Sequence, residues 1–298
     1  MRTRWYGGDT GLTLRMFLAM FLLAAVYLAF LAVLWWIGVE FLPLVVIASG
    51  LLLVQYFLSD QLVLLSMGAR IVTPAEAPEL HGIIDRLSAL GDLPKPKVAI
   101  VNSNIPNAFA TGRNQSNSVV AVTTSLLDRL NRQELEAVIA HELTHIKNRD
   151  VAVITIASFL STVAFFILRS SMFGGFGYGR GRGRNGGSII LVYLASLLAW
   201  AISFLLIRAL SRYREYAADR GAAILTGAPS QLASALIRIS NTIQRIPDRD
   251  LREVEGMNAF FIVPAVSRSS IAELFSSHPS VQNRIERLSR MQQEMEGL

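Results

Sequence analysis

The feature that most constrains this chain is a set of four long apolar segments without charged residues. They cover residues 16–37, 41–57, 151–168 and 189–207. A helix needs about 20 apolar residues to cross the hydrocarbon core of a bilayer, and the first segment reaches that length. The second follows after a short connection, so we expect these two to form an antiparallel hairpin. The third and fourth lie near the lower limit of length. We predict that they form a second membrane hairpin, with buried core helices as the alternative.

The composition supports a membrane protein and restricts its chemistry. Only 17% of the residues are charged and the mean hydropathy is +0.42, whereas soluble domains average about 25% charged residues. The chain has no cysteine, which excludes disulfides, thiolate metal sites and cysteine nucleophiles. A transition-metal site must therefore use histidine, aspartate or glutamate. The four histidines are His81, His141, His145 and His278.

The flanks of the apolar segments predict orientation. The first segment is longer than the apolar part of a signal peptide, about 7–15 residues, so we expect a retained anchor. With four crossings, residues 58–150 and 208–298 share one side, which has more Lys and Arg near the membrane ends; we expect that side to be cytoplasmic. The segments contain no ionisable residue, which favours anchors over an ion path. Residues 174–187 are rich in Gly and Arg. We interpret them as a flexible connection rather than an RNA-binding segment, and we expect no nucleic-acid partner.

Residues 58–150 have the pattern of an α/β segment. Apolar residues at helical spacing predict a helix over 78–90, where His81 is expected to be structural. Residues 97–101, 106–112 and 119–123 are predicted strands. A further helix is expected to begin at Asn131, because Glu134 stands three residues on, at the spacing of a capping box.

That helix continues into His141-Glu142-Leu-Thr-His145, an H-E-x-x-H motif. Residues four apart lie one turn apart on a helix, so both imidazoles can bind one Zn²⁺. Glu142 is offset from the pair and can reach the open coordination position, where it would act as general base on a zinc-bound water. The motif therefore predicts a catalytic site with one zinc ion per chain.

A third protein ligand is expected from the segment after the fourth apolar run. Asn148 and Val151 exclude the extended metzincin motif, so a carboxylate on another helix is the remaining option. Glu215 and Asp219 lie one helical turn apart. We predict Glu215 as the ligand and Asp219 as the acceptor for a ligand histidine's free N–H, with a solvated charged helix as the alternative. His145 lies about 9 Å before the third span and Glu215 about 12 Å after the fourth, at 1.5 Å per residue. An antiparallel pair of spans would bring them to similar heights.

Taken together, these motifs resemble the HtpX membrane metalloproteases, gluzincin relatives of the Ste-type CAAX prenyl proteases. The resemblance covers essentially the whole chain and also includes residues 107–112 and 275–279. It implies a zinc endopeptidase of the bacterial inner membrane, with a cytoplasmic active site, that degrades damaged or misfolded membrane proteins, often within stress responses. We include the chain itself among the potential substrates. The lipid bilayer is the other expected partner.

The resemblance also implies roles for residues outside the zinc motif. The resemblance implies that residues 107–112 form an edge strand that binds extended substrate by β-augmentation, with the backbone of Ala108 nearest the scissile bond. The alternative is an edge strand without a role in substrate binding. His278 would donate to the tetrahedral oxyanion, or else be a helix-start or core histidine. Arg284 is a substrate contact or a structural ion pair. The expected substrate-binding set is Asn107, Ala108, Phe109, Ala110 and Arg284.

These inferences give an α+β fold class: a mainly helical integral membrane protein with four transmembrane helices and a zincin-type domain with a small β-sheet. We divide the chain into a membrane hairpin (1–57), the first part of the catalytic domain (58–150), a second hairpin (151–207) and the second part of the catalytic domain (208–298). Competing functions are a CAAX-type protease with a prenylated substrate, an intramembrane site-2-type protease and a membrane adaptor with a structural zinc site. The compact chain disfavours the first, and the polar residues 147–150 disfavour the second. A structural zinc site usually has four protein ligands, which disfavours the adaptor.

Overall fold

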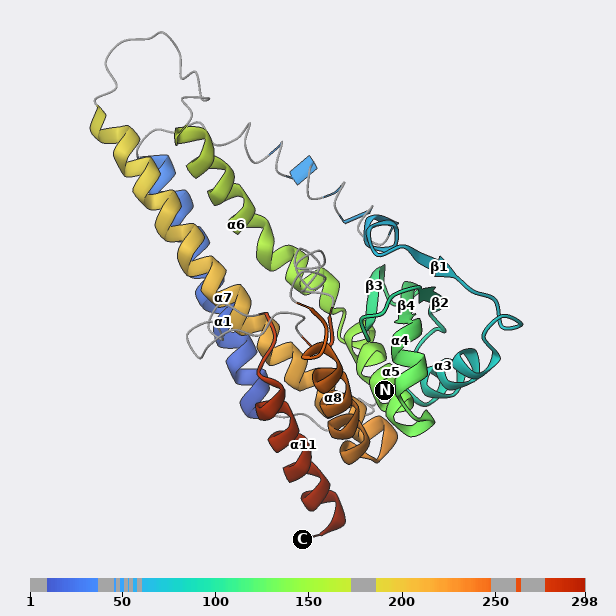
Figure 1. Ribbon diagram of the computed structural model, residues 1–298. Helices are drawn as coiled ribbons and strands as arrows, with labels where there is room; N and C mark the ends of the chain where they lie inside the picture. Colours follow the sequence, from blue (N-terminus) through green and yellow to red (C-terminus); the bar gives the residue numbers. More distant parts are fainter. Residues whose placement is uncertain are drawn as a thin grey trace.

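The structure is a computed structural model that describes residues 10–36, 46, 49–50, 53, 56–57, 61–172, 186–247, 261–263 and 277–297. Most of the predicted apolar segment 41–57 and most of the Gly/Arg-rich segment lie outside the described residues. The elements that position the site are three long helices, a four-stranded sheet and a set of shorter helices (Figure 1). This architecture confirms the predicted α+β class, mainly helical with a small sheet.

Three of the described helices are long and apolar enough to cross a membrane. They are α1 (Thr10–Trp36), α6 (Asp150–Met172) and α7 (Gly186–Thr226). The three contact one another, and Phe30, Ala164 and Ala199 are among the buried residues between them (Figure 1). Their other faces expose large apolar side chains such as Phe21, which is 59% exposed. Apolar surface of this extent is expected where lipid is the solvent.

Helix α7 is continuous for 41 residues. At 1.5 Å per residue it is ~60 Å long, about twice the thickness of the hydrocarbon core. The apolar segment 189–207 and the acidic residues Glu215 and Asp219 therefore lie on one continuous helix. The division of the chain at residue 208 falls inside this helix.

The sheet has the strand order β1-β2-β4-β3. The strands are β1 (Ala69–Ile71), β2 (Lys97–Val101), β3 (Ala108–Asn114) and β4 (Asn117–Thr123). Strands β2 and β4 pair in parallel, and the other two pairs are antiparallel. The three predicted strands are present, and β1 is an addition that the sequence pattern did not predict. Strand β3 lies at the edge of the sheet.

The helix that carries the zinc motif, α5 (Arg132–Lys147), begins as predicted. The side chain of Asn131 accepts from the Glu134 amide at 2.9 Å, and the Glu134 carboxylate accepts from the Asn131 amide at 3.0 Å. This capping box satisfies two backbone donors that the first turn leaves unpaired. The predicted helix over 78–90 is α3 (Pro78–Leu90), and its His81 is buried with Nε2 3.0 Å from the Val72 carbonyl oxygen.

Close packing of α5 against α7 sets the position of the acidic residues. A Cβ atom added to Gly221 would lie 2.4 Å from Cγ2 of Thr144, which is fully buried. Only glycine allows the two helices to approach this closely. The main core is completed by α4 (Thr124–Arg129), α8 (Pro229–Ile243), α11 (Val281–Glu296) and residues 261–263.

The bend between α5 and α6 depends on Arg149, a non-glycine residue with φ of 56°. This left-handed conformation costs most L-residues roughly 1–2 kcal/mol. We therefore expect Arg149→Gly to retain or raise the melting temperature of the purified protein, and Arg149→Val to lower it. The matched control is Arg290, an exposed residue within α11. At position 290 the glycine variant should have the lower melting temperature of the two, since glycine destabilises a helix interior more than valine does. The same order at both positions would contradict this explanation.

Candidate active site

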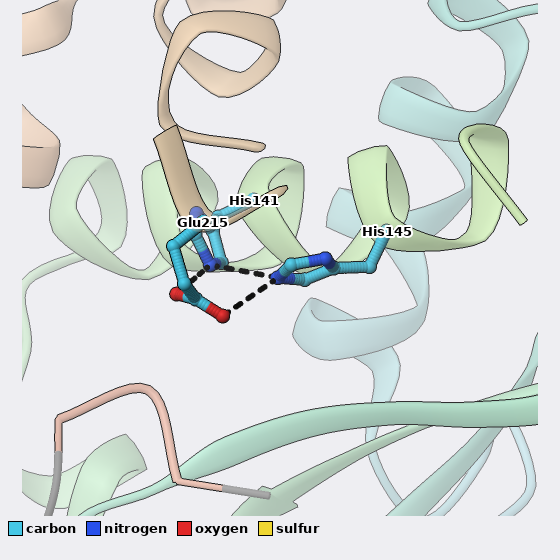
Figure 2. Close-up of side chains that lie close together, drawn as sticks. All are labelled: His141, His145 and Glu215. Carbon is cyan, nitrogen blue, oxygen red and sulfur yellow. Dashed lines mark hydrogen bonds and ion pairs between the residues drawn. The ribbon is translucent and has the colours of Figure 1, made fainter. Parts of the chain in front are cut away.

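The structure brings His141, His145 and Glu215 together (Figure 2). The Nε2 atoms of the two histidines on α5 are 3.1 Å apart. The Glu215 carboxylate, which comes from α7, lies 3.5 Å from His141 Nε2 and 3.6 Å from His145 Nε2. Ligands bound tetrahedrally to zinc at about 2.1 Å stand about 3.4 Å from one another. The three side chains therefore fit a single zinc ion.

A carboxylate on α7 binds the far side of the first imidazole. His141 Nδ1 lies 3.0 Å from Asp219 Oδ1. Asp219 also accepts two hydrogen bonds from Arg284, from Nε at 2.9 Å and from Nη2 at 2.6 Å. All three side chains are about 1% exposed. This arrangement directs His141 Nε2 toward Glu215.

The second imidazole has a corresponding partner that the sequence analysis missed. His145 Nδ1 lies 2.5 Å from Asp150 Oδ2, and Asp150 forms an ion pair with Arg214. The sequence does contain a signal, because Asp150 follows His145 by five residues. Its approach, however, depends on the bend at Arg149.

Glu142 lies beside the triad and is 4% exposed. Burial raises the pKa of its carboxyl group to about 7, although the positive charge of His141 and a hydrogen bond from the Ala110 amide oppose the shift. A general base is most effective when its pKa lies near the working pH. In the site without a metal ion, the pKa of Glu142 therefore lies in the range that suits a general base at neutral pH.

The two imidazoles differ in their affinity for protons when no metal is bound. Burial acts to lower the pKa of His141, but the hydrogen bonds to Asp219 and Glu215 outweigh it and raise this pKa to about 9. Burial and the neighbouring His141 lower the pKa of His145 to about 3. Without a metal ion the site therefore favours a proton on His141 over one on His145, and proton and metal compete for the His141 ring.

His278 and Arg284 both lie at this site. His278 Nδ1 is 3.3 Å from Glu215 Oε1, and the residue is 5% exposed. Arg284 Nη1 is 3.5 Å from Glu215 Oε2 and donates to the Ile262 carbonyl oxygen at 2.6 Å. The structural ion pair expected of Arg284 is thus present, with Asp219. Contacts of either residue with substrate stay predictions.

The predicted substrate strand corresponds to β3. The side chain of Asn107 is fully buried and accepts a hydrogen bond from the Ile262 amide at 3.0 Å. The Asn107 carbonyl also accepts from the Thr123 amide at 2.9 Å. Because bonded pairs alternate in an antiparallel ladder, Phe109 also bonds toward β4, while Ala108 and Ala110 direct their backbone groups away from β4. The Ala110 amide indeed bonds to Glu142. The side of β3 that faces away from β4 is therefore directed at the general-base candidate.

A small groove lies beside His145 and strand β3. It is lined by residues 110–114 and 118, by residues 145–146 of α5, and by Arg149, Asp150, Val151 and Ala152 at the start of α6. Tyr56, at the end of the second apolar segment, donates to the Arg113 carbonyl oxygen at 2.9 Å. The far end of the groove is therefore adjacent to two predicted membrane segments.

The fold and this site define the class of protein: a membrane-associated metalloprotease built around a helical H-E-x-x-H motif. Residues 74–292 match the sequence profile of peptidase family M48, and the chain belongs to that family. It is 60% identical to a "Protease HtpX homolog" of Moorella thermoacetica, over 98% of both chains. It is also 59% identical to "Protease HtpX homolog 2" of Methanosarcina mazei, over 99% of this chain and all of the relative. These relatives confirm the resemblance to the HtpX proteases.

A solved structure supports the fold. The crystal structure of Ste24p from S. mikatae matches with a TM-score of 0.58 at 21% identity, covering 94% of this chain and 67% of the other. At that level of identity the likeness concerns the fold alone.

Proposed function

We propose that the protein is a zinc endopeptidase that hydrolyses peptide bonds of misfolded or damaged membrane proteins. The observation that carries the proposal is the convergence of His141, His145 and Glu215 beside Glu142 and the edge strand β3. These three side chains would hold the ion. Bound zinc supplies a Lewis acid that polarises a carbonyl and lowers the pKa of water.

The remaining residues are assigned according to their positions. Extended substrate adds to the side of β3 that faces away from β4, where the backbone groups of Ala108 and the carbonyl group of Ala110 pair with it. Glu142 accepts the proton of the attacking water and delivers it to the leaving amine. His278, buried next to Glu215, donates to the oxyanion that forms at the scissile carbonyl. Asp219 and Arg284 hold His141 in place.

The position of the groove supports a membrane-protein substrate. Val151 and Ala152 line it and belong to the first turn of α6, a candidate span. A polypeptide that leaves the bilayer beside α6 can therefore reach β3 directly. Cleavage of the chain itself is a variant of the same proposal, with a second copy as substrate.

The test is cleavage of casein by the full-length protein in detergent. We expect activity with stoichiometric zinc, loss of activity on chelation, and recovery when zinc is added back. The alternative, an adaptor with a structural zinc site, predicts bound zinc without cleavage. Zinc-replete protein that does not cleave casein or a denatured membrane protein would favour that alternative.

We further propose that the active site faces the cytoplasm, on the bacterial inner membrane. Because the chain has no cysteine, single cysteines report accessibility without background. We expect Ser116→Cys to react with a membrane-impermeant maleimide only from the cytoplasmic side. Gly181→Cys, between α6 and α7, should react only from the opposite side. Labelling of both from one side would contradict a spanning α6–α7 hairpin.

A further inference from the structure

Each of the two site histidines is bound to an aspartate that is in turn bound to an arginine. His141 contacts Asp219, and Asp219 in turn contacts Arg284. His145 contacts Asp150, and Asp150 in turn contacts Arg214. The first chain of contacts links α5 to α7 and α11. The second joins the site to the candidate membrane helices.

Arg214 holds residue 150 at two points. Its Nη1 donates to the Asp150 carbonyl oxygen at 2.6 Å, and its Nη2 forms an ion pair with Asp150 Oδ1. The second carboxylate oxygen, Oδ2, is thereby left for His145 Nδ1, 2.5 Å away. Asp150 is 8% exposed and Arg214 is 3% exposed. A buried ion pair of this kind is strongly coupled, because removal of one partner leaves the other charge uncompensated.

The positions of these residues in the fold explain what the contact can transmit. Asp150 is the first residue of α6, directly after the bend at Arg149. Arg214 lies on α7 immediately before Glu215. The guanidinium thus fixes the α5–α6 junction to the same turn of α7 that supplies the third ligand candidate. Together with the close α5–α7 packing at Gly221, this contact therefore helps to fix the separation between His145 and Glu215.

We propose that Asp150 and Arg214 are a positioning pair for His145. Asp150 accepts the Nδ1 hydrogen, which leaves the Nε2 lone pair directed at the metal position. Arg214 fixes the carboxylate and the backbone at residue 150, and it acts on the imidazole only through Asp150. Neither residue is among the three side chains whose ligand atoms converge. The inference rests on the proposed zinc site.

The test is the zinc affinity of the full-length protein in detergent, measured by competition with a chromophoric chelator at fixed pH. We expect Asp150→Asn and Arg214→Met each to weaken binding by about 10–100-fold. Asp150 and Arg214 act through one chain of contacts. The zinc affinity of the double variant should therefore be no lower than the lower of the two single-variant affinities. The matched control is Arg208→Met, also on α7, whose guanidinium lies over the Phe204 ring. This control should bind zinc like the unmodified protein.

A spectroscopic measurement distinguishes positioning from general loss of structure. We expect the visible absorption bands of the cobalt-loaded protein to shift in Asp150→Asn and Arg214→Met but not in Arg208→Met. Arg214→Lys keeps the charge without the fork geometry and should lie between Arg214→Met and the unmodified protein in affinity. Should Arg214→Met not fold, Asp150→Asn and Arg214→Lys decide the question.

Three results would overturn the proposal. The first is an unchanged zinc affinity of Arg214→Met or, if that variant does not fold, of Asp150→Asn and Arg214→Lys. The second is an unchanged cobalt spectrum in the folded variants, and the third is a double variant in which the two losses of affinity multiply. These results differ from a failure of the proposed function, in which the unmodified protein itself binds no zinc.

Discussion

Peptide hydrolysis by the Glu142→Gln variant should fall by about 10²–10⁴-fold, the usual contribution of a positioned acid–base group. Zinc content should stay stoichiometric, because Glu142 is not among the three side chains whose ligand atoms converge. Glutamine has the same size and can still accept the hydrogen bond from the Ala110 amide, so the scaffold is retained. It cannot take a proton from water. The measurement is casein cleavage by zinc-loaded protein, together with metal analysis of the same sample.

The control for this variant is Glu136→Gln on the same helix. Glu136 forms ion pairs with Arg86 and Arg132 at the surface, and surface pairs contribute little to stability. Its variant should cleave at the rate of the unmodified protein. Near-normal cleavage by Glu142→Gln would refute the general-base assignment, whatever the metal content.

The parts of the fold that the sequence predicted are those with local signals. Helix α3 has apolar residues at helical spacing, and α5 begins with a capping box that involves only Asn131 and Glu134. The convergence of Glu215 with the zinc motif was also accessible, because an antiparallel pair of spans returns the chain to its starting level. That argument needed the topology but no side-chain geometry.

The parts that the sequence did not predict depend on contacts between distant elements or on unusual backbone. Strand β1 has three residues, too few for an alternating pattern to show. The Asp150–Arg214 pair requires the left-handed conformation of Arg149, which arginine seldom adopts. The close approach at Gly221 is visible only once Thr144 faces it. In each case tertiary packing decides what local propensity leaves open.

The loss of metal should be greatest when Glu215 is replaced. Its oxygens lie at 3.5 and 3.6 Å from the two Nε2 atoms, and without them two imidazoles and water hold zinc weakly. We therefore expect Glu215→Gln to lose stoichiometric zinc and, with it, activity. The matched comparison is Asp219→Asn, which also exchanges a carboxylate for an amide of equal size. The amide keeps an oxygen for Arg284, whereas Asp219→Ala would remove both hydrogen bonds that Asp219 accepts from this buried arginine.

The ranking of these two variants separates a ligand from a residue that orients a ligand. Asp219 contacts His141 Nδ1 rather than the metal position, so Asp219→Asn should weaken zinc affinity by only about 10–100-fold. Added zinc should then restore cleavage by Asp219→Asn and fail to restore it in Glu215→Gln, because mass action compensates for a weaker site but not for a missing ligand. Metal analysis and cleavage over a series of zinc concentrations would measure both effects. Stoichiometric zinc in Glu215→Gln, with loss in Asp219→Asn, would mean that the two carboxylates have the opposite roles.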